Sequence, residues 1–429
     1  ERHYGVAADA IERIMDEEPE APAANAAFLP AGATEDLEKT ADSASVIRVV
    51  NDVINQAIAE RATDIHLENF GDEARLRYRV DGVLRDARIS TDLRFLYPAI
   101  VSRIKIMSGL DIIERRIPQD GRAKVKVGPR EYDLRISAIP TIHGENIVIR
   151  ILPTTLLLSL GDLGMVAEDL ARIDRLIRCP NGILFVTGPT GSGKSTTLYA
   201  SLKKLNLPGG KLVTIEDPVE YALKGVSQVQ VNPKIGLSFA RALRHMLRHD
   251  PDVIMVGEIR DQETASIAIR AALTGHLVLS TLHTNDAAGA VTRLLDIGVE
   301  PYLVASSARA FVAQRLVRVL CPACRVPCAL DAEAAAEFGL APADAPPVYR
   351  AKGCERCAHS GFKGRTGLYE ILMVTAPIRE LIVQRAPADQ IKHRAVELGM
   401  RTLLKDGFEK VARGITTAEE VLQVARDQE

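Results

Sequence analysis

One segment constrains this chain more than any other feature of its sequence: Gly188-Pro189-Thr190-Gly191-Ser192-Gly193-Lys194-Ser195, followed directly by Thr196. An apolar run at residues 183–186 precedes it and a helix-forming stretch at residues 196–200 follows, which gives the order strand, glycine loop, helix. Glycines let backbone N–H groups close around a phosphate chain at a helix N-terminus. Lys194 would then reach the β- and γ-phosphates, and the Ser195 hydroxyl would ligate Mg²⁺. A glycine-rich turn without a ligand is the alternative, and the flanking strand and helix favour nucleotide binding.

Composition limits the remaining possibilities. The chain has 429 residues, of which 47% are hydrophobic, enough for several cores. Lys and Arg number 54 against 56 Asp and Glu, so the net charge does not indicate a nucleic-acid partner. No apolar run approaches the roughly 20 residues that span a bilayer, and no signal-peptide pattern opens the chain. We therefore expect a cytosolic protein that reaches a membrane only through partners. Because the chain begins with Glu1, we also expect a fragment of a longer protein.

The first part of the chain predicts an α+β domain behind an arm. Residues 1–44 are rich in Pro and Ala and read as an arm or linker, with one amphipathic stretch at residues 7–17. Residues 45–157 mix helical and alternating patterns. Helices are expected at 45–61 and 93–108, and strands at 64–68, 74–80, 83–89, 122–127, 131–139 and 146–151.

The later part predicts a parallel α/β core with additions. Residues 158–317 carry apolar strands, expected at 183–187, 212–216, 253–256 and 277–282, alternating with helices. Residues 318–372 form a cysteine-bearing insertion. Residues 373–429 form a helical tail, with helices at 378–384, 388–397, 403–412 and 418–425.

Two acidic residues follow apolar strands of this core. Glu258 ends the run at residues 252–258, where an acid faces Mg²⁺ and the attacking water in a P-loop sheet. Glu216 opens a cluster of carboxylates at residues 216–220 that could hold Mg²⁺ through water or assist the base. Solvated acids at strand ends are the alternative for both positions. We expect Glu258 and Glu216 to be catalytic together with Lys194.

Basic side chains near these strands are further candidates. Arg244 and Arg248 are four residues apart on an expected helix, so they share one face and could clamp phosphate; a solvated charged face is the alternative. His276 and His283 flank the strand at residues 277–282. Satisfied core histidines are the alternative, but the Ser and Thr neighbours favour nucleotide contact by His276 and a phosphate-sensing, catalytic role for His283.

The cysteines form two pairs, Cys321 with Cys324 and Cys354 with Cys357, separated by 29 residues. Four thiolates at this spacing suit a closed tetrahedral Zn²⁺ site of structural kind. Chance spacing or a redox pair is the alternative. Cys179 and Cys328 lie outside the pattern.

Together these motifs resemble the secretion ATPase superfamily of type II secretion and type IV pilus assembly. The resemblance rests on residues 61–68 (RATDIHLE), 214–220, 248–261 (RHDPDVIMVGEIRD) and 274–284, and it covers nearly all of the chain from Ala44. The tetracysteine segment and residues 361–372 are most similar to the GspE-type members that serve type II secretion. The resemblance implies a RecA-like P-loop ATPase core, a smaller PAS-like α+β domain before it, and ATP, Mg²⁺ and Zn²⁺ as ligands.

The resemblance also implies site residues and partners. Arg135 and Arg150 of the smaller domain would reach the nucleotide phosphates, Glu258 would be the Walker B glutamate, and Glu216 would belong to the acidic box. His276 and His283 would form the histidine box. The assembly would be a homo-hexamer on the cytoplasmic face of the inner membrane, with a GspL-like anchoring partner and a GspF-like platform protein and no nucleic acid. The N-terminal docking domain of type II members has no match here.

Three alternatives remain. A type IV pilus assembly ATPase has the same motifs. A helicase or packaging ATPase would combine a RecA-like core with a zinc segment, although balanced charge and scarce aromatics count against it. A GTP switch lacks an Asn-Lys-x-Asp element.

Overall fold

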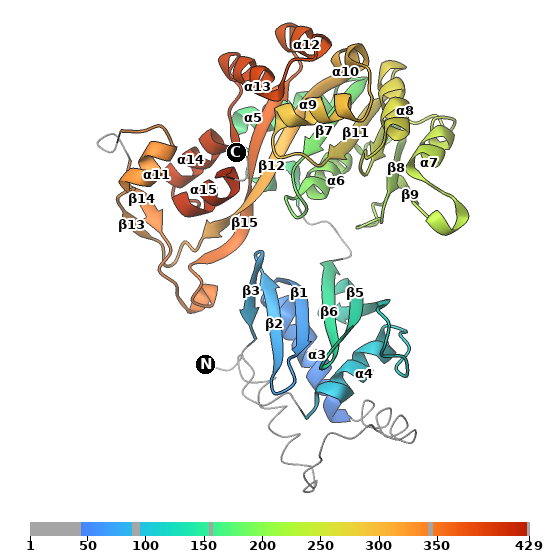
Figure 1. The fold of residues 1–429 in the computed structure, drawn as a ribbon, viewed down its shortest axis with the longest axis vertical. Helices are drawn as coiled ribbons and strands as arrows, with labels where there is room; N and C mark the ends of the chain where they lie inside the picture. The colour runs from blue at the N-terminus through green and yellow to red at the C-terminus, as the bar shows by residue number, and fades with distance from the viewer. Residues whose placement is uncertain (1–43, 88–94, 154–157, 342–345, 427–429) are drawn as a thin grey trace, which may run out of the picture. The chain divides into compact units, whose positions relative to one another are not determined.

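A computed structural model of the chain describes residues 44–87, 95–153, 158–341 and 346–426. The chain divides into two compact units, residues 1–154 and 155–429, which we describe separately (Figure 1). The expected arm at residues 1–44, with its amphipathic stretch at residues 7–17, lies outside the described residues apart from Ala44. So do the end of the expected strand at 83–89 and the start of the expected helix at 93–108.

In the residues that the structure describes, the first unit is an α+β sandwich of one antiparallel sheet and two helices. The sheet has the strand order β3-β2-β1-β6-β5-β4. Its strands are β1 (Ala62–Asn69), β2 (Ala74–Val80), β3 (Val83–Asp86), β4 (Gln119–Val127), β5 (Arg130–Thr141) and β6 (Gly144–Pro153), and the helices are α3 (Ala44–Ala59) and α4 (Tyr97–Met107).

Hydrophobic periodicity explains why both helices cover the same face. In α3 the buried residues Val46, Val49, Val50, Val53, Ile54 and Ala57 recur every three or four positions and form one apolar stripe. In β5 the buried residues alternate with polar ones, so that Leu134 and Ile136 join the core with α3 and α4. Arg135 and Ser137 therefore lie on the opposite, open face of the sheet.

The second unit is built on a seven-stranded sheet in the order β15-β12-β7-β11-β10-β8-β9. All neighbours pair in parallel except β12 and β15, which are antiparallel. The strands are β7 (Gly182–Thr187), β8 (Leu212–Glu216), β9 (Val226–Gln230), β10 (Val253–Val256), β11 (Leu277–Leu282), β12 (Ala308–Leu320) and β15 (Phe362–Met373). The expected parallel α/β core is confirmed.

Helices cover both faces of this sheet, so its central strands are buried throughout. In β7, Leu184 and Val186 pack with α5 and α6, whereas Ile183 and Phe185 pack against the helices of the other face. Helices on the first face are α5 (Ala167–Ile177) and α6 (Lys194–Leu205); those on the second include α7 (Phe239–Met246), α8 (Gln262–Leu273), α9 (Ala287–Asp296) and α10 (Pro301–Ser307). Short 3₁₀ turns lie at Leu160–Leu163, Pro233–Ile235 and Glu355–Cys357.

The C-terminal part differs in one respect from the expected division of the chain. The expected boundary between residues 317 and 318 falls inside β12. The end of the expected insertion at 318–372, from Phe362 onward, belongs to β15. Both strands pair in the core sheet, because their apolar residues pack against α6, α9, α14 and α15. Only the segment between them forms a separate small sheet of β13 (Val326–Cys328) and β14 (Val348–Arg350) with α11 (Ala332–Glu337).

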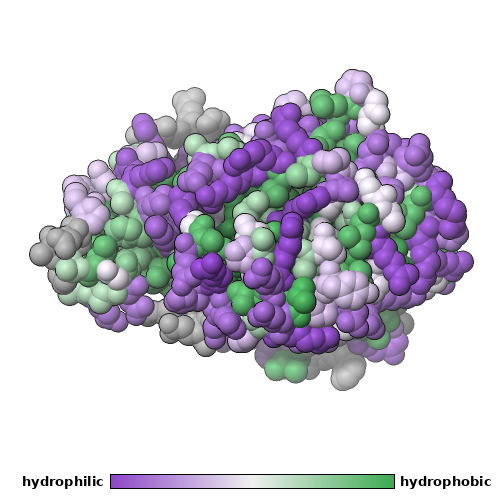
Figure 2. Space-filling view, turned by 90° about the horizontal axis from the view of Figure 1, so that it is seen from above, coloured by the Kyte–Doolittle hydropathy of each residue, from purple (hydrophilic) through white to green (hydrophobic). Residues whose placement is uncertain are grey.

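The chain ends in four helices, as expected. They are α12 (Ala376–Val383), α13 (Ala388–Glu397), α14 (Leu403–Ala412) and α15 (Ala418–Arg426). Figure 2 shows a face that is mostly hydrophilic, with hydrophobic side chains in small separate areas. Within the described residues, none of the helices combines the length and apolar character needed to cross a membrane.

Candidate nucleotide-binding site

The glycine loop joins the end of β7 to the start of α6. Gly188, Gly191 and Gly193 all have positive φ angles, of 149°, 81° and 87°. Two of them also lie against β12: a Cβ at Gly188 would come within 2.5 Å of the backbone oxygen of Gln314, and one at Gly193 within 2.8 Å of its Nε2. These positions therefore require glycine for both conformation and space.

The Lys194 ammonium lies inside this loop. Its side chain is buried, and Nζ donates hydrogen bonds to the carbonyl oxygens of Gly188 at 2.7 Å and Pro189 at 3.0 Å. The pKa of Lys194 is lowered to about 8, chiefly by burial; Glu258 opposes the shift and Arg315 adds to it. Ser195, the next residue, is exposed at the first turn of α6, where its hydroxyl is available to a cation.

Glu258 and His283 meet beside this loop at the carboxyl ends of the neighbouring strands. In the strand order β7-β11-β10 these ends lie at one edge of the sheet. His283 Nε2 is 3.3 Å from Glu258 Oε2, and Arg260 Nη2 is 2.7 Å from Glu258 Oε1. Burial, followed by the charge of Lys194, lowers the pKa of His283 below its usual 6.5, which favours the neutral imidazole.

Threonine hydroxyl groups fix this arrangement. The Thr281 hydroxyl donates to the Gly257 carbonyl oxygen at 2.6 Å, which ties the segment carrying Glu258 to β11. The hydroxyls of Thr187 and Thr284 lie 2.7 Å apart, and the Thr284 N–H donates to Thr187 Oγ1 at 2.9 Å. The turn after His283 is therefore held to the last residue before the glycine loop.

Glu216 lies in a different setting from Glu258. It is buried at the end of β8, and its carboxylate accepts hydrogen bonds from the Tyr199 hydroxyl, from Thr214 Oγ1 at 2.6 Å and from Gln228 Nε2 at 3.0 Å. The Tyr199 hydroxyl also accepts from the backbone N–H of Glu220. Through Tyr199, Glu216 thus connects α6 to the acidic loop. Its expected role in catalysis stays a prediction.

Arg244 and Arg248 lie on an exposed surface. Arg244 forms an ion pair with Glu263 of α8, and Arg248 donates to the Arg244 carbonyl oxygen at 3.2 Å. Helix α7 ends at Met246, so Arg248 lies in the turn beyond it. Within the described residues, no hydrogen bond or ion pair joins either arginine to Lys194 or Glu258.

His276 lies at the start of β11, whereas the glycine loop lies beyond the end of its parallel neighbour β7. Its Nδ1 is 2.9 Å from the Ala271 carbonyl oxygen at the end of α8. The sequence placed His276 and His283 at the two ends of one strand, and the structure shows that only His283 shares an edge with the glycine loop of the same chain. Nucleotide contact by His276 stays a prediction.

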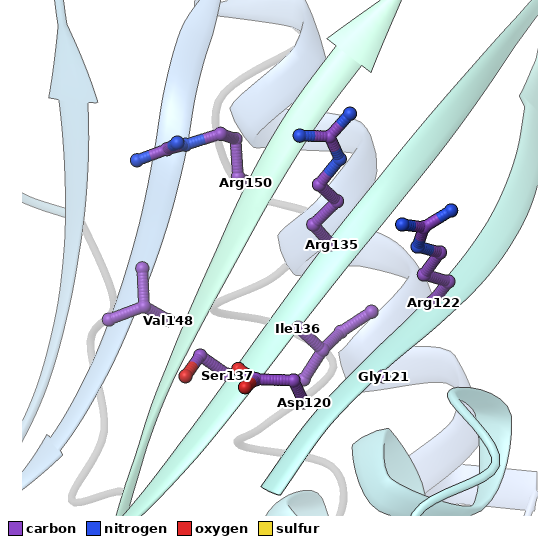
Figure 3. A pocket seen from close by; sticks show the side chains of 8 residues that line it. All are labelled: Asp120, Gly121, Arg122, Arg135, Ile136, Ser137, Val148 and Arg150. Carbon is purple, nitrogen blue, oxygen red and sulfur yellow. The ribbon is translucent and has the colours of Figure 1, made fainter. Parts of the chain in front are cut away.

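Arg135 and Arg150 lie in the first unit, on adjacent strands and directly opposite each other in register. With Arg122 they line a cavity of about 490 Å³ on the open face of the sheet, whose other walls include Asp120, Gly121 and Ser137 (Figure 3). Three guanidinium groups around one cavity make it suited to an anion.

The four expected cysteines form one cluster. The Sγ atoms of Cys321, Cys324, Cys354 and Cys357 all lie within 4.8 Å of one another, with Cys321 to Cys354 at 3.9 Å and Cys324 to Cys357 at 3.8 Å. A tetrahedral Zn²⁺ with bonds of about 2.3 Å requires S to S separations of about 3.8 Å, so the residues fit the ion. Cys179 and Cys328 lie outside the cluster.

Sequence reasoning missed several residues of the site. Arg260, which holds Glu258, stands two positions after it in the quoted block at 248–261. Gln314 accepts a hydrogen bond at 2.7 Å from the Thr197 hydroxyl of α6. Only the pairing of β12 with β7 brings Gln314 to this site, and the sequence predicts no strand there.

The fold and these residues define a P-loop nucleotide-binding protein with an acid and a histidine at the phosphate end. A family model described as "Type II/IV secretion system protein" matches residues 39–423, and the chain belongs to this family. The chain is 51% identical to "Type II secretion system protein E" of Pseudomonas aeruginosa over 396 residues, which are 92% of this chain and 78% of that protein.

Two other proteins extend the comparison. The chain is 48% identical to "Type II secretion system ATPase E" of Vibrio cholerae over 394 residues, which cover 92% of this chain and 78% of the relative. Among solved structures, it resembles the ADP-bound pilus retraction motor PilT with a TM-score of 0.60 at 26% identity, covering 87% of this chain and 96% of PilT. The expected superfamily and the expected fold class, a P-loop core with a smaller α+β domain, a tetracysteine segment and a helical tail, are confirmed.

Proposed function

We propose that this chain hydrolyses ATP to ADP and phosphate and that the hydrolysis powers type II protein secretion, by driving pseudopilus assembly through an inner-membrane platform. One observation carries the enzymatic part: Lys194, Glu258 and His283 come together at one edge of the sheet although they lie far apart in sequence. The secretion part is supported by family membership and by relatives named for type II secretion at about 50% identity.

The chemistry follows from the positions of the side chains. The backbone N–H groups of residues 188–196, apart from Pro189, and the Lys194 ammonium bind the phosphates. Ser195 is the residue that would ligate Mg²⁺, which supplies charge neutralisation at the β- and γ-phosphates. Glu258 orients the attacking water, while Arg260 fixes one carboxylate oxygen and His283 contacts the other. A neutral His283 places no second cation beside the Glu258 carboxylate.

The arginines of the first unit respond to the state of the nucleotide. Arg135 and Arg150 bind phosphate oxygens of ATP, and loss of the γ-phosphate on hydrolysis removes contacts from them. Glu216 transmits changes at α6 to the acidic loop through Tyr199. Arg244, Arg248 and His276 act on a nucleotide only if a second copy of the chain supplies them, which agrees with the homo-hexamer that we propose.

The remaining assignments are also proposals. The tetracysteine cluster holds a structural Zn²⁺. The finer division that we propose has an arm at residues 1–44, a PAS-like domain at 45–157, an ATPase core from residue 158 that includes β12 and β15, a zinc segment between those two strands, and a tail at 373–429. The partners are the cytoplasmic domain of a GspL-like anchoring protein and a GspF-like platform protein, which bring the ATPase to the cytoplasmic face of the inner membrane.

Steady-state ATP hydrolysis tests the proposal. Wild type, Lys194→Ala and Glu258→Gln are compared with and without single-stranded DNA, and the mass in solution is measured in parallel. We expect both variants to lose activity by about 100-fold or more, the order of magnitude for a group that stabilises the transition state. Activity should rise with a hexamer-sized species and be indifferent to DNA.

Each of these measurements excludes one alternative. Wild-type hydrolysis by Glu258→Gln would remove the assignment of the base. Strong stimulation by DNA would indicate a nucleic-acid motor instead. Stimulation by the cytoplasmic domain of a pilus-assembly partner, and not by that of a type II partner, would indicate the type IV pilus role that the likeness to PilT leaves as the nearest alternative.

A further inference from the structure

A row of charged residues crosses the open face of the first unit's sheet. Arg122 on β4, Arg135 on β5 and Arg150 on β6 are neighbours in register. The row continues with Asp64 on β1 and Arg79 on β2. Asp64 is the single acid among four arginines, and it is buried, with a relative exposure of 8%.

A β-bulge places Asp64 in this row. Ala62 and Ile65 both belong to the apolar core, although strict alternation along a strand puts residues three positions apart on opposite faces. The pairing of β1 with β2 shifts between Ala62 and Asp64, which leaves Thr63 as the extra residue. The shift brings Asp64 to the open face; bulges commonly re-aim a side chain in this way.

Asp64 accepts a hydrogen bond from the Nε atom of Arg150. Arg150 Nε donates to Asp64 Oδ1 at 3.0 Å, while Thr63 Oγ1 donates to Asp64 Oδ2 at 2.8 Å. Figure 3 shows the Arg150 side chain extending sideways, away from Arg135. Because the contact uses Nε, the two terminal amino groups of Arg150 stay outward, and its side chain remains 62% exposed. That fork is the part of a guanidinium that binds two phosphate oxygens at once.

We propose that Asp64 is a positioning residue that presents the Arg150 fork to the phosphates of ATP. The inference rests on the proposed function, in which Arg150 binds those phosphates. Asp64 does not touch the nucleotide. It restricts the side-chain conformations of an exposed arginine. It also offsets part of the positive charge of the row, which reduces the repulsion between Arg150 and Arg79.

The test compares Asp64 with a second ion pair made by strand β1. Glu68 of β1 and Arg77 of β2 form a bidentate pair on the same open face, with hydrogen bonds of 2.7 and 2.8 Å, outside the arginine row. We expect Asp64→Ala to lower kcat/KM for ATP about tenfold in the full chain, the scale of one charge-assisted hydrogen bond. Asp64→Asn should cost less, because its amide oxygen still accepts from Nε. Glu68→Gln should leave kcat/KM unchanged.

A double-mutant cycle with Arg150→Gln separates positioning from general stability. If Asp64 acts through Arg150, Asp64→Ala should cost nothing more in kcat/KM once Arg150 is replaced. An equal loss in both backgrounds overturns the inference, as does a loss matched by Glu68→Gln. If Arg150→Gln alone hydrolyses ATP as the wild type does, the proposed role of Arg150 fails, and the inference fails with it for a different and visible reason.

A second pair of variants covers poor folding of Asp64→Ala. Thr63→Val keeps every charge but removes the hydroxyl that fixes Asp64 Oδ2, whereas Thr63→Ser keeps the hydroxyl. We expect a loss of about two- to threefold in kcat/KM for the valine variant and recovery in the serine variant, at equal melting temperatures. Equal activity of the two variants would contradict the positioning role.

Discussion

The imidazole of His283 lies against the carboxylate of Glu258, with His283 Nε2 3.3 Å from Glu258 Oε2. The two residues follow adjacent parallel strands, β11 and β10, and Lys194 of the next strand's loop is close enough to influence the pKa of His283. Protonation of His283 would add a second cation beside the proposed base. The structure therefore links the charge of one histidine to the reactivity of one carboxylate.

This link predicts an acid limit to hydrolysis. Burial and Lys194 lower the pKa of His283, so the imidazole becomes charged at a pH below its usual 6.5. Because folding favours the neutral form, the contribution of His283 to stability also falls as the pH drops below 6.5. We expect kcat to decline on the acid side and His283→Gln to lose part of that decline. His393→Gln, on the exposed surface of α13, is the control. An acid limb identical in wild type and His283→Gln would contradict the assignment.

The lowered pKa of Lys194 predicts that the protein takes up a proton when ATP binds. Its pKa is lowered from 10.5 to about 8, chiefly by burial, so part of the population is neutral at pH 8.5. Between these two pKa values the unfolded chain binds more protons, so this group's contribution to stability rises with pH across that window. Phosphates favour the ammonium and raise its pKa, and ATP affinity should weaken above pH 8.

Calorimetry at pH 8.5 in two buffers with different ionisation enthalpies measures that uptake. We expect the apparent binding enthalpies to differ. Glu258→Gln should move the loss of affinity to lower pH, because Glu258 raises the pKa of Lys194 in the wild type. Equal enthalpies in the two buffers would show that Lys194 binds ATP without a change of charge.

The sequence predicted those parts of the site that carry their chemistry in a short stretch. Residues 188–196 and the two cysteine pairs each combine residue types and spacing that few other roles require, and Glu258 ends an apolar run. Arg260, Thr284 and Gln314 carry no such signal. These residues contact Glu258, Thr187 and Thr197, respectively. The contacts depend on local turns and on the strand order β12-β7-β11-β10, and that order is a property of the tertiary structure.

The same distinction applies to the fold. Strands β8, β10 and β11 match the expected ranges residue for residue, because buried parallel strands read as short continuous apolar runs. No strand was expected over β12, because Gln314, Arg315 and Arg318 interrupt its apolar residues. The bulge at Thr63 was not expected either, because the extra residue is defined only by the partner strand.

Removal of metal from the tetracysteine cluster should destabilise the second unit without abolishing the nucleotide site. We expect one Zn²⁺ per chain by elemental analysis and its loss in Cys321→Ser, with a lower melting temperature, because the thiolates have little apolar core around them. Cys328→Ser is the control, since Cys328 lies outside the cluster. Full metal content in Cys321→Ser, or loss of metal in Cys328→Ser, would contradict the ligand set.

A buried ionic cluster links helix α14 to the core of the second unit. Asp406 of α14 is fully buried and accepts hydrogen bonds from Lys410 Nζ at 2.5 Å, Arg401 Nη2 at 3.2 Å and the backbone N–H of Tyr369 at 2.9 Å. Arg401 also pairs with Asp169 of α5 at 2.7 Å. Removal of one partner from such a cluster leaves uncompensated buried charge, which costs about 3–5 kcal/mol.

We therefore expect Asp406→Asn to lower the unfolding free energy of the second unit by about that amount. Denaturant titration followed by circular dichroism measures it, with the transitions of the two units fitted separately because the chain is not a single cooperative domain. Glu397→Gln, which breaks the exposed pair with Arg394, should leave the transition unchanged. The unfolding of α14 and α15 should precede that of the core in Asp406→Asn, detectable as early hydrogen exchange in those helices. A cooperative shift of the whole second unit, with no early exchange, would show that the cluster stabilises the core and not the attachment of its C-terminal helices.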